Sequence, residues 1–169
     1  MTGSPLGQAA IADITEIEQL LARYAIGMTR NDVQSVIDVF TTDGTYSAFG
    51  STYQLDEFPE LVAAAPKGLF MTGTPVLELN GDEGTGMQTL CFVDQTNHDM
   101  RIGYYTDTYK RTERGWRLHT RFMTFLRRSG ARDSGVAHDP RRPIPRSSAS
   151  SASSAPSAPS VPSAPPSAE

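Results

Sequence analysis

Asp107 is a candidate for chemistry, because this carboxylate interrupts a tyrosine-rich stretch with the alternation of a β-strand. If Asp107 faces the interior, Gly103, Tyr105 and Tyr109 face it too, since alternate residues of a strand share one face. An unpaired buried carboxylate is costly, so an inward Asp107 needs a partner or must stay protonated. The alternative is an exposed Asp107 that pairs with a Lys or Arg of the neighbouring strand.

His119 and Arg121 are a second candidate pair, two residues apart on the last predicted strand, so they are expected to share one face. If that face is inward, His119 could supply a base and Arg121 an anion anchor. If it is outward, both side chains meet solvent or a second subunit. Cys91 lies in an apolar run and is expected to be a buried structural thiol. No spacing of His, Asp or Glu suggests a metal site, and no cofactor is expected.

The elements that position these residues begin with an amphipathic helix, whose apolar residues recur at steps of three and four. These are Ile14, Ile17, Leu20, Leu21, Tyr24 and Met28. Asn31, with Gln34 three residues on, is a predicted N-cap for a second helix, which Asp32 caps or flanks. The apolar stripe of that helix is Val33, Val36, Ile37 and Phe40. A turn is predicted over residues 42–44 and a short strand over 45–49.

Further along, residues from Asp56 predict a third short helix that ends at Pro66 and Gly68. Strands are predicted over residues 76–79, 84–93, 100–111 and 116–126, with a hairpin turn at Asn80-Gly81. Helices followed by antiparallel strands favour the α+β class.

The C-terminal part of the chain changes composition. From residue 147 onward it is Ser, Ala and Pro except for Val161 and Glu169, so it cannot offset its ordering entropy and a disordered tail is predicted. The predicted organisation is a disordered N-terminus (1–10), one domain (11–128), an irregular extension (129–146) and the tail (147–169).

Charge and hydropathy exclude several function classes. The formal charge of −4 is mild, and the small basic clusters are not interleaved with aromatic residues, which argues against nucleic-acid binding. No apolar run reaches the roughly 20 residues of a membrane span, so no membrane partner is expected. The acidic first 20 residues lack the basic region of a signal peptide. These features predict a cytoplasmic protein.

Two blocks carry a family resemblance: the segment from Arg23-Tyr24 to Tyr46, and residues 104–118. Together they resemble the SnoaL-like branch of the nuclear-transport-factor-2-like superfamily, over roughly residues 10–128. The resemblance implies a cone-shaped, curved antiparallel sheet with three N-terminal helices around an internal ligand pocket.

The ketosteroid isomerases of this superfamily form an oxyanion hole from a tyrosine and a protonated aspartic acid, and use an aspartate base. The resemblance puts Tyr24 at the tyrosine position and Asp107 at the acid position, with Ala48 at the position of the base. A core tyrosine is the alternative role for Tyr24. Scytalone dehydratase and its relatives use an Asp and a His, and Thr29 and Phe70 stand at those positions here.

The predicted function is a small-molecule pocket protein that acts by proton transfer, as an isomerase, dehydratase or cyclase. The expected substrate is neutral, apolar and ring-containing, of steroid-like or polyketide-like class. The predicted catalytic residues are Tyr24, Asp107 and His119, and the predicted substrate-binding residues are Met28, Phe40, Tyr46, Phe70, Tyr105, Tyr109 and Arg121. The alternative is a non-catalytic ligand-binding or assembly protein. A homodimer is expected, with a trimer as the alternative.

Overall fold

A computed structural model of the protein describes residues 8–127. The predicted extension and tail, and residues 1–7 of the predicted disordered N-terminus, lie outside the described residues. The elements in chain order are α1 (Gln8–Arg30), α2 (Val33–Ile37), β1 (Phe40–Ala48), β2 (Ser51–Gln54), a 3-10 turn (Leu55–Glu57), α3 (Phe58–Ala64), β3 (Gly68–Thr72), β4 (Val76–Asn80), β5 (Glu83–Asp94), β6 (Met100–Thr112) and β7 (Gly115–Arg127).

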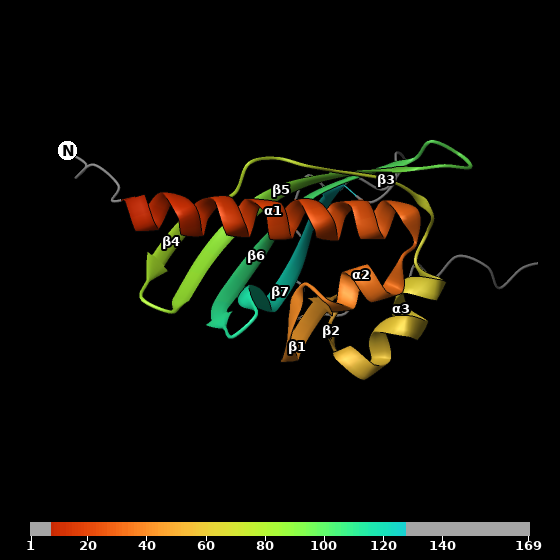
Figure 1. Ribbon diagram of the computed structural model, residues 1–169. Helices are drawn as coiled ribbons and strands as arrows, with labels where there is room; N and C mark the ends of the chain where they lie inside the picture. The colour runs from red at the N-terminus through yellow and green to blue at the C-terminus, as the bar shows by residue number, and fades with distance from the viewer. Residues whose placement is uncertain (1–7, 128–169) are drawn as a thin grey trace, which may run out of the picture.

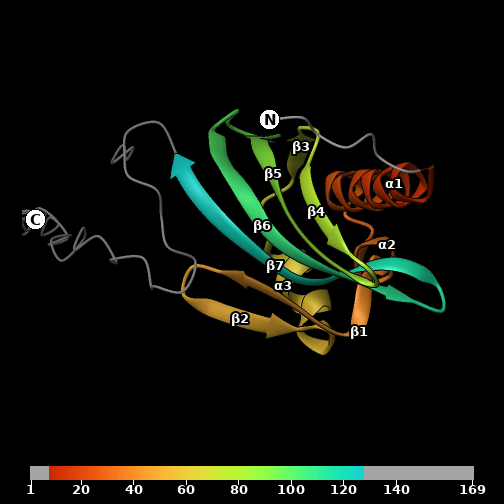
Figure 2. The ribbon, with the colours of Figure 1, turned by 90° about the vertical axis from the view of Figure 1, so that its left-hand side faces the viewer.

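The predicted α+β class is confirmed. One curved sheet has the strand order β2-β1-β7-β6-β5-β3, with β4 also paired to β5. The long strands β5, β6 and β7 bend together (Figure 2), while α1 lies along the sheet and α2 and α3 gather near one end of α1 (Figure 1). One pair departs from the predicted antiparallel arrangement, because β1 and β7 run parallel. The sheet is therefore mixed.

The apolar stripe of α1 provides much of the core, as the spacing predicted. Ile17, Leu20, Leu21 and Tyr24 are all buried, and they join buried residues of the sheet in a single cluster. Each side chain of this size contributes about 1.5–3 kcal/mol when it is removed from water. Burial of this stripe fixes α1 against the concave side of the sheet.

At the junction between α1 and α2, the observed N-cap of the second helix differs from the predicted one. Asn31 has a φ of 58° and so ends α1 in the left-handed region that asparagine tolerates well. Asp32 is the N-cap of α2, where its Oδ1 accepts a hydrogen bond from the Ser35 amide at 3.1 Å. The capping role predicted for Asp32 is confirmed, and that of Asn31 is wrong.

Several local features of the sheet also differ from the prediction. Phe40 was predicted in the stripe of the second helix but begins β1, and β3 was not predicted. Residues 42–44 belong to β1, at a point where its register against β7 shifts. Phe49 and Gly50 both have positive φ and turn β1 into β2, a strand that the sequence did not predict. The β4–β5 hairpin exists, but Asn80 pairs with Glu83, so the loop lies one residue later than predicted. No helix within residues 8–127 has the length and hydropathy to cross a membrane.

Candidate functional site

A cavity of about 230 Å³ opens between the concave face of the sheet, α1 and α3. Five of the predicted binding or catalytic residues line it: Tyr24, Met28, Tyr46, Phe70 and Tyr105. They come from α1, β1, β3 and β6, so the pocket depends on the curvature of the sheet and on the packing of α1. Most of the remaining lining is aliphatic or aromatic.

Phe40 and Tyr109 do not line the cavity, although both were predicted to do so. Phe40 is 1% exposed and packs edge-on against the rings of Tyr24 and Phe58, with ring centroids 6.2 and 5.1 Å away. Tyr109 is equally buried, and its hydroxyl donates a hydrogen bond to Asp107 Oδ2 at 2.9 Å. Phe40 therefore packs against a lining side chain, and Tyr109 bonds to Asp107, but neither residue reaches the cavity.

The polar groups of the lining are the phenols of four tyrosines and one guanidinium. These residues are Tyr24, Tyr46, Tyr53, Tyr105 and Arg101. No Asp, Glu, His, Cys or Lys contributes to the lining within residues 8–127. Burial raises the pKa values of the Tyr24, Tyr46 and Tyr105 phenols, so these groups remain protonated at neutral pH. The cavity thus offers hydrogen-bond donors to a ligand and, among the side chains that the structure describes, none that commonly acts as a general base.

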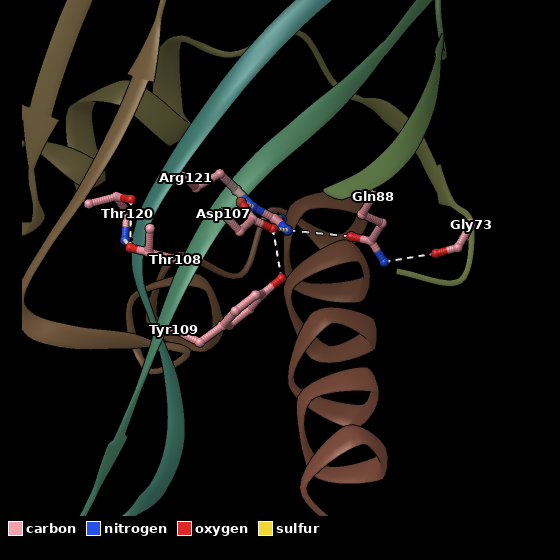
Figure 3. Close-up of polar contacts among 7 residues, drawn as sticks. All are labelled: Gly73, Gln88, Asp107, Thr108, Tyr109, Thr120 and Arg121. Atoms are coloured by element: carbon pink, nitrogen blue, oxygen red, sulfur yellow. Dashed lines mark hydrogen bonds and ion pairs between the residues drawn. The ribbon is translucent and has the colours of Figure 1, made fainter. Parts of the chain in front are cut away.

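A buried ion pair lies next to the cavity and joins β6 to β7 (Figure 3). Arg121 donates from Nε to Asp107 Oδ1 at 2.9 Å and from Nη2 to Asp107 Oδ2 at 2.7 Å. The same Nη2 lies 3.3 Å from Gln88 Oε1, and the Gln88 amide donates to the Gly73 carbonyl at 2.9 Å. The exposed fraction is 1% for Asp107 and 0% for Arg121.

This geometry corrects the predicted oxyanion hole. Asp107 accepts hydrogen bonds from the Arg121 guanidinium and the Tyr109 hydroxyl, so it acts as the acceptor in each of these contacts. It also stays outside the cavity lining, whereas Tyr24 belongs to it. An inward Asp107 was predicted to need either a charged partner or a proton. In the structure it has a charged partner, Arg121. The inward orientation of Gly103, Tyr105 and Tyr109 is confirmed by their burial.

Arg121 stands directly behind two cavity tyrosines. Its Cζ lies 3.8 Å from the ring centroid of Tyr105 and 4.4 Å from that of Tyr24. Burial disfavours the charge of this guanidinium, but the Asp107 carboxylate outweighs that effect and raises the pKa of Arg121 above its ordinary value. Arg121 Nη1 is buried and has no hydrogen-bond partner among the described residues. The anion that Arg121 binds is therefore Asp107. The flat face of its guanidinium lies against the rings of Tyr24 and Tyr105, which form one end of the cavity, called the phenol end.

His119 and Arg121 do not share a face, contrary to the prediction. Thr108 pairs with Thr120 but Tyr109 pairs with Leu118, so His119 is the extra residue of a bulge. The parity of β7 changes there, and Arg121 points inward while His119 does not. His119 Nδ1 lies 3.1 Å from Thr41 Oγ1, outside the cavity lining. A hydrogen bond between the Thr108 and Thr120 hydroxyls, 2.7 Å long, joins the strands beside the bulge (Figure 3).

The positions that resemble the dehydratase pair are neighbours in space. The Phe70 amide donates to Thr29 Oγ1 at 3.1 Å, and the Thr29 hydroxyl in turn donates to the Ala25 carbonyl at 2.9 Å. The fold thus brings these two positions together, but a threonine and a phenylalanine cannot act as an acid–base pair. Within the described part of the chain, no group of three His, Cys, Asp or Glu residues could hold a metal ion.

A helix-covered curved sheet with an apolar cavity defines a pocket protein of the nuclear-transport-factor-2-like fold. The sequence model of the SnoaL-like domain family matches residues 9–122, and the chain belongs to that family. No curated protein matches the sequence.

Solved structures share the fold at low sequence identity. A protein of unknown function from Mycobacterium tuberculosis is 23% identical with a TM-score of 0.65, covering 70% of this chain and 79% of that one. A putative scytalone dehydratase from Novosphingobium aromaticivorans is 14% identical with a TM-score of 0.63, covering 80% and 95%. A hexachlorocyclohexane dehydrochlorinase (LinA type 2) is 15% identical with a TM-score of 0.62, covering 69% and 87%. At these identities the likeness concerns the fold alone.

Proposed function

We propose that this protein binds an apolar, ring-containing small molecule in its cavity, of steroid-like or polyketide-like class. The observation that carries the proposal is the composition of the lining, which combines aromatic and aliphatic side chains with a few phenols and one guanidinium. Pockets of this kind bury most of a ligand through apolar contact and orient it with a small number of polar groups. Aromatic walls favour a flat ring, which can pack against them by edge or face.

The phenols of Tyr24 and Tyr105 are the proposed contacts for a carbonyl or hydroxyl oxygen of the ligand. Their rings meet edge-on, with centroids 5.9 Å apart, so both side chains are at the same end of the cavity. The Arg121 cation behind them opposes the effect of burial on the pKa of each phenol. A nearby cation makes a phenol a better hydrogen-bond donor, so this end of the cavity suits an acceptor oxygen.

Calorimetric titration with 2-acetylnaphthalene, a flat apolar ketone, tests the proposal. Tyr24→Phe removes one donor and should weaken binding by about 1 kcal/mol, or roughly fivefold. Tyr104→Phe is the matched control, because Tyr104 lies on the same strand as Tyr105 but outside the cavity lining. This control should bind like the wild type. Failure of the wild type to bind any member of a panel of ring ketones and hydroxy compounds would refute the proposal.

Proton-transfer catalysis, as isomerisation, dehydration or cyclisation, is the second candidate. It is favoured by the two phenols backed by a buried cation, since such donors can stabilise negative charge that develops on a carbonyl oxygen. It ranks second because, among residues 8–127, the lining contains no side chain suited to remove a proton. By the resemblance to the isomerases, Ala48 stands at the position of their base, and it lines the cavity.

A turnover assay on the compounds that bind separates the two candidates. Conversion by the wild-type protein would favour the enzyme, and tight binding without conversion would favour the binder. Ala48→Asp adds a carboxylate to the cavity wall, and measurable ketosteroid isomerisation by this variant would show that the phenol end can support the chemistry. A circular-dichroism melt of the variant establishes that it remains folded.

A further inference from the structure

Arg101 is the one charged side chain in the cavity lining formed by residues 8–127. It lies near the start of β6, is partly buried, and its Cζ is 5.6 Å from the ring centroid of Phe92. Within the described residues, no carboxylate oxygen lies within 4 Å of its guanidinium. This differs from the buried Arg121, which is paired with Asp107 at 2.7 Å.

The charge of Arg101 acts on the interior of the cavity. Burial raises the pKa of the Tyr46 phenol, and the Arg101 cation is among the charges that act in the opposite direction. A cation held against an aromatic ring at an apolar wall has lost part of its hydration, so it gains more from an anionic partner than a fully exposed cation does.

Arg101 and Tyr105 lie on the same strand, four residues apart, so their Cα atoms are about 13 Å apart along β6. Both side chains line the cavity, so a ligand with one polar group at each end of two fused rings is a suitable probe of both. A guanidinium matches the planar geometry of a carboxylate and can donate two parallel hydrogen bonds to it. One positive charge suits a monoanion better than a doubly charged phosphate.

We infer that the cavity selects apolar ring compounds that carry a carboxylate, with the acid on Arg101 and an acceptor oxygen on Tyr24 and Tyr105. The inference rests on the proposed ligand-binding function and narrows its ligand class. It differs from the neutral compound expected from the sequence, which gave no role to Arg101.

The experiment compares 6-acetyl-2-naphthoate with its carboxamide, 6-acetyl-2-naphthamide, which has the same shape and no charge. Calorimetric titrations at neutral pH give the dissociation constant of each compound for the wild type, Arg101→Gln, Arg101→Lys and Arg23→Gln. Arg23 is an exposed arginine of α1 outside the cavity lining, so its variant loses the same charge elsewhere on the protein. 2-Acetylnaphthalene is titrated in parallel as the ligand without an acid.

The wild type should bind the acid at least about tenfold more tightly than the amide, the scale expected for a charge-assisted bidentate contact. Arg101→Gln should abolish this preference through weaker binding of the acid, while it leaves amide binding within about twofold. Arg101→Lys should keep part of the preference, and Arg23→Gln should keep all of it.

Equal affinity of the wild type for acid and amide, or an undiminished preference in Arg101→Gln, would overturn the inference while the ligand-binding function stands. If neither naphthalene compound nor 2-acetylnaphthalene binds the wild type, this inference fails, and the proposed function fails with it when no member of the panel of ring ketones and hydroxy compounds binds either.

Discussion

Asp107→Asn should destabilise the protein strongly, because it leaves the guanidinium of Arg121 buried without its counter-ion. Both side chains are at most 1% exposed, and they share two hydrogen bonds of 2.9 and 2.7 Å. An asparagine has one acceptor oxygen, so its amide group would face the donors of Arg121. Loss of one partner from a buried ion pair costs about 3–5 kcal/mol. The free energy of unfolding from urea titration measures this cost.

Two further variants isolate the cause. Asp107→Leu combined with Arg121→Met removes both charges together, so it should cost less than Asp107→Asn alone, since no unpaired charge remains. Asp82→Asn removes a carboxylate that is 80% exposed and pairs with Arg111 at 3.0 Å, and it should change stability by less than about 1 kcal/mol. If Asp107→Asn costs less than about 1 kcal/mol as well, the ion pair does not act as the geometry implies, and a protonated Asp107 regains support.

Three further predictions concern pH, assembly and the tail. A hydrogen bond from Arg111 lowers the pKa of Asp13 below its ordinary value of 3.8. The stabilisation is therefore complete above that value and is lost as pH falls through the lower folded-state pKa, so Asp13→Asn should flatten the acid limb of a stability-versus-pH curve. Light scattering should give a homodimer, because Leu69, Met71 and other apolar side chains are exposed, and a monomer at micromolar concentration would contradict this. Deletion of residues 147–169 should leave the melting temperature nearly unchanged, and a drop of many degrees would mean that the segment packs on the domain.

Local patterns predicted most elements, and non-local pairing explains several of the differences. The three-and-four spacing located α1, and the alternation of apolar residues located β4 to β7 within one or two residues. The parallel pairing of β1 with β7 joins segments about 75 residues apart in the chain, and no local pattern encodes it. The β1–β2 turn depends on Phe49 in the left-handed region, which a bulky residue rarely adopts.

In the candidate site too, local patterns predicted some residues, and features that no local pattern encodes determined the rest. Strand parity identified Gly103, Tyr105, Asp107 and Tyr109 as inward residues, and one further step of the alternation beyond Gly103, toward the start of β6, would have included Arg101. Parity failed on β7, because a bulge at His119 shifts the inward position to Arg121 and leaves no trace in the sequence. An inward Asp107 was expected to need a partner or a proton, and a Lys or Arg of the neighbouring strand was expected only for an exposed Asp107. The identity of Arg121 as the buried partner required the observed register.

The methionine methyl groups can show directly whether the apolar cavity is the ligand site. Met28 and Met123 line the cavity, whereas Met71 and Met87 are exposed and lie outside it. Selective ¹³C-methyl labelling of methionine, followed by NMR titration with 2-acetylnaphthalene, reports on all four positions at once. Binding in the cavity should give saturable shifts at Met28 and Met123 with little change at Met71 and Met87. Shifts confined to Met71 and Met87, or no saturable shift at any methyl group, would contradict it.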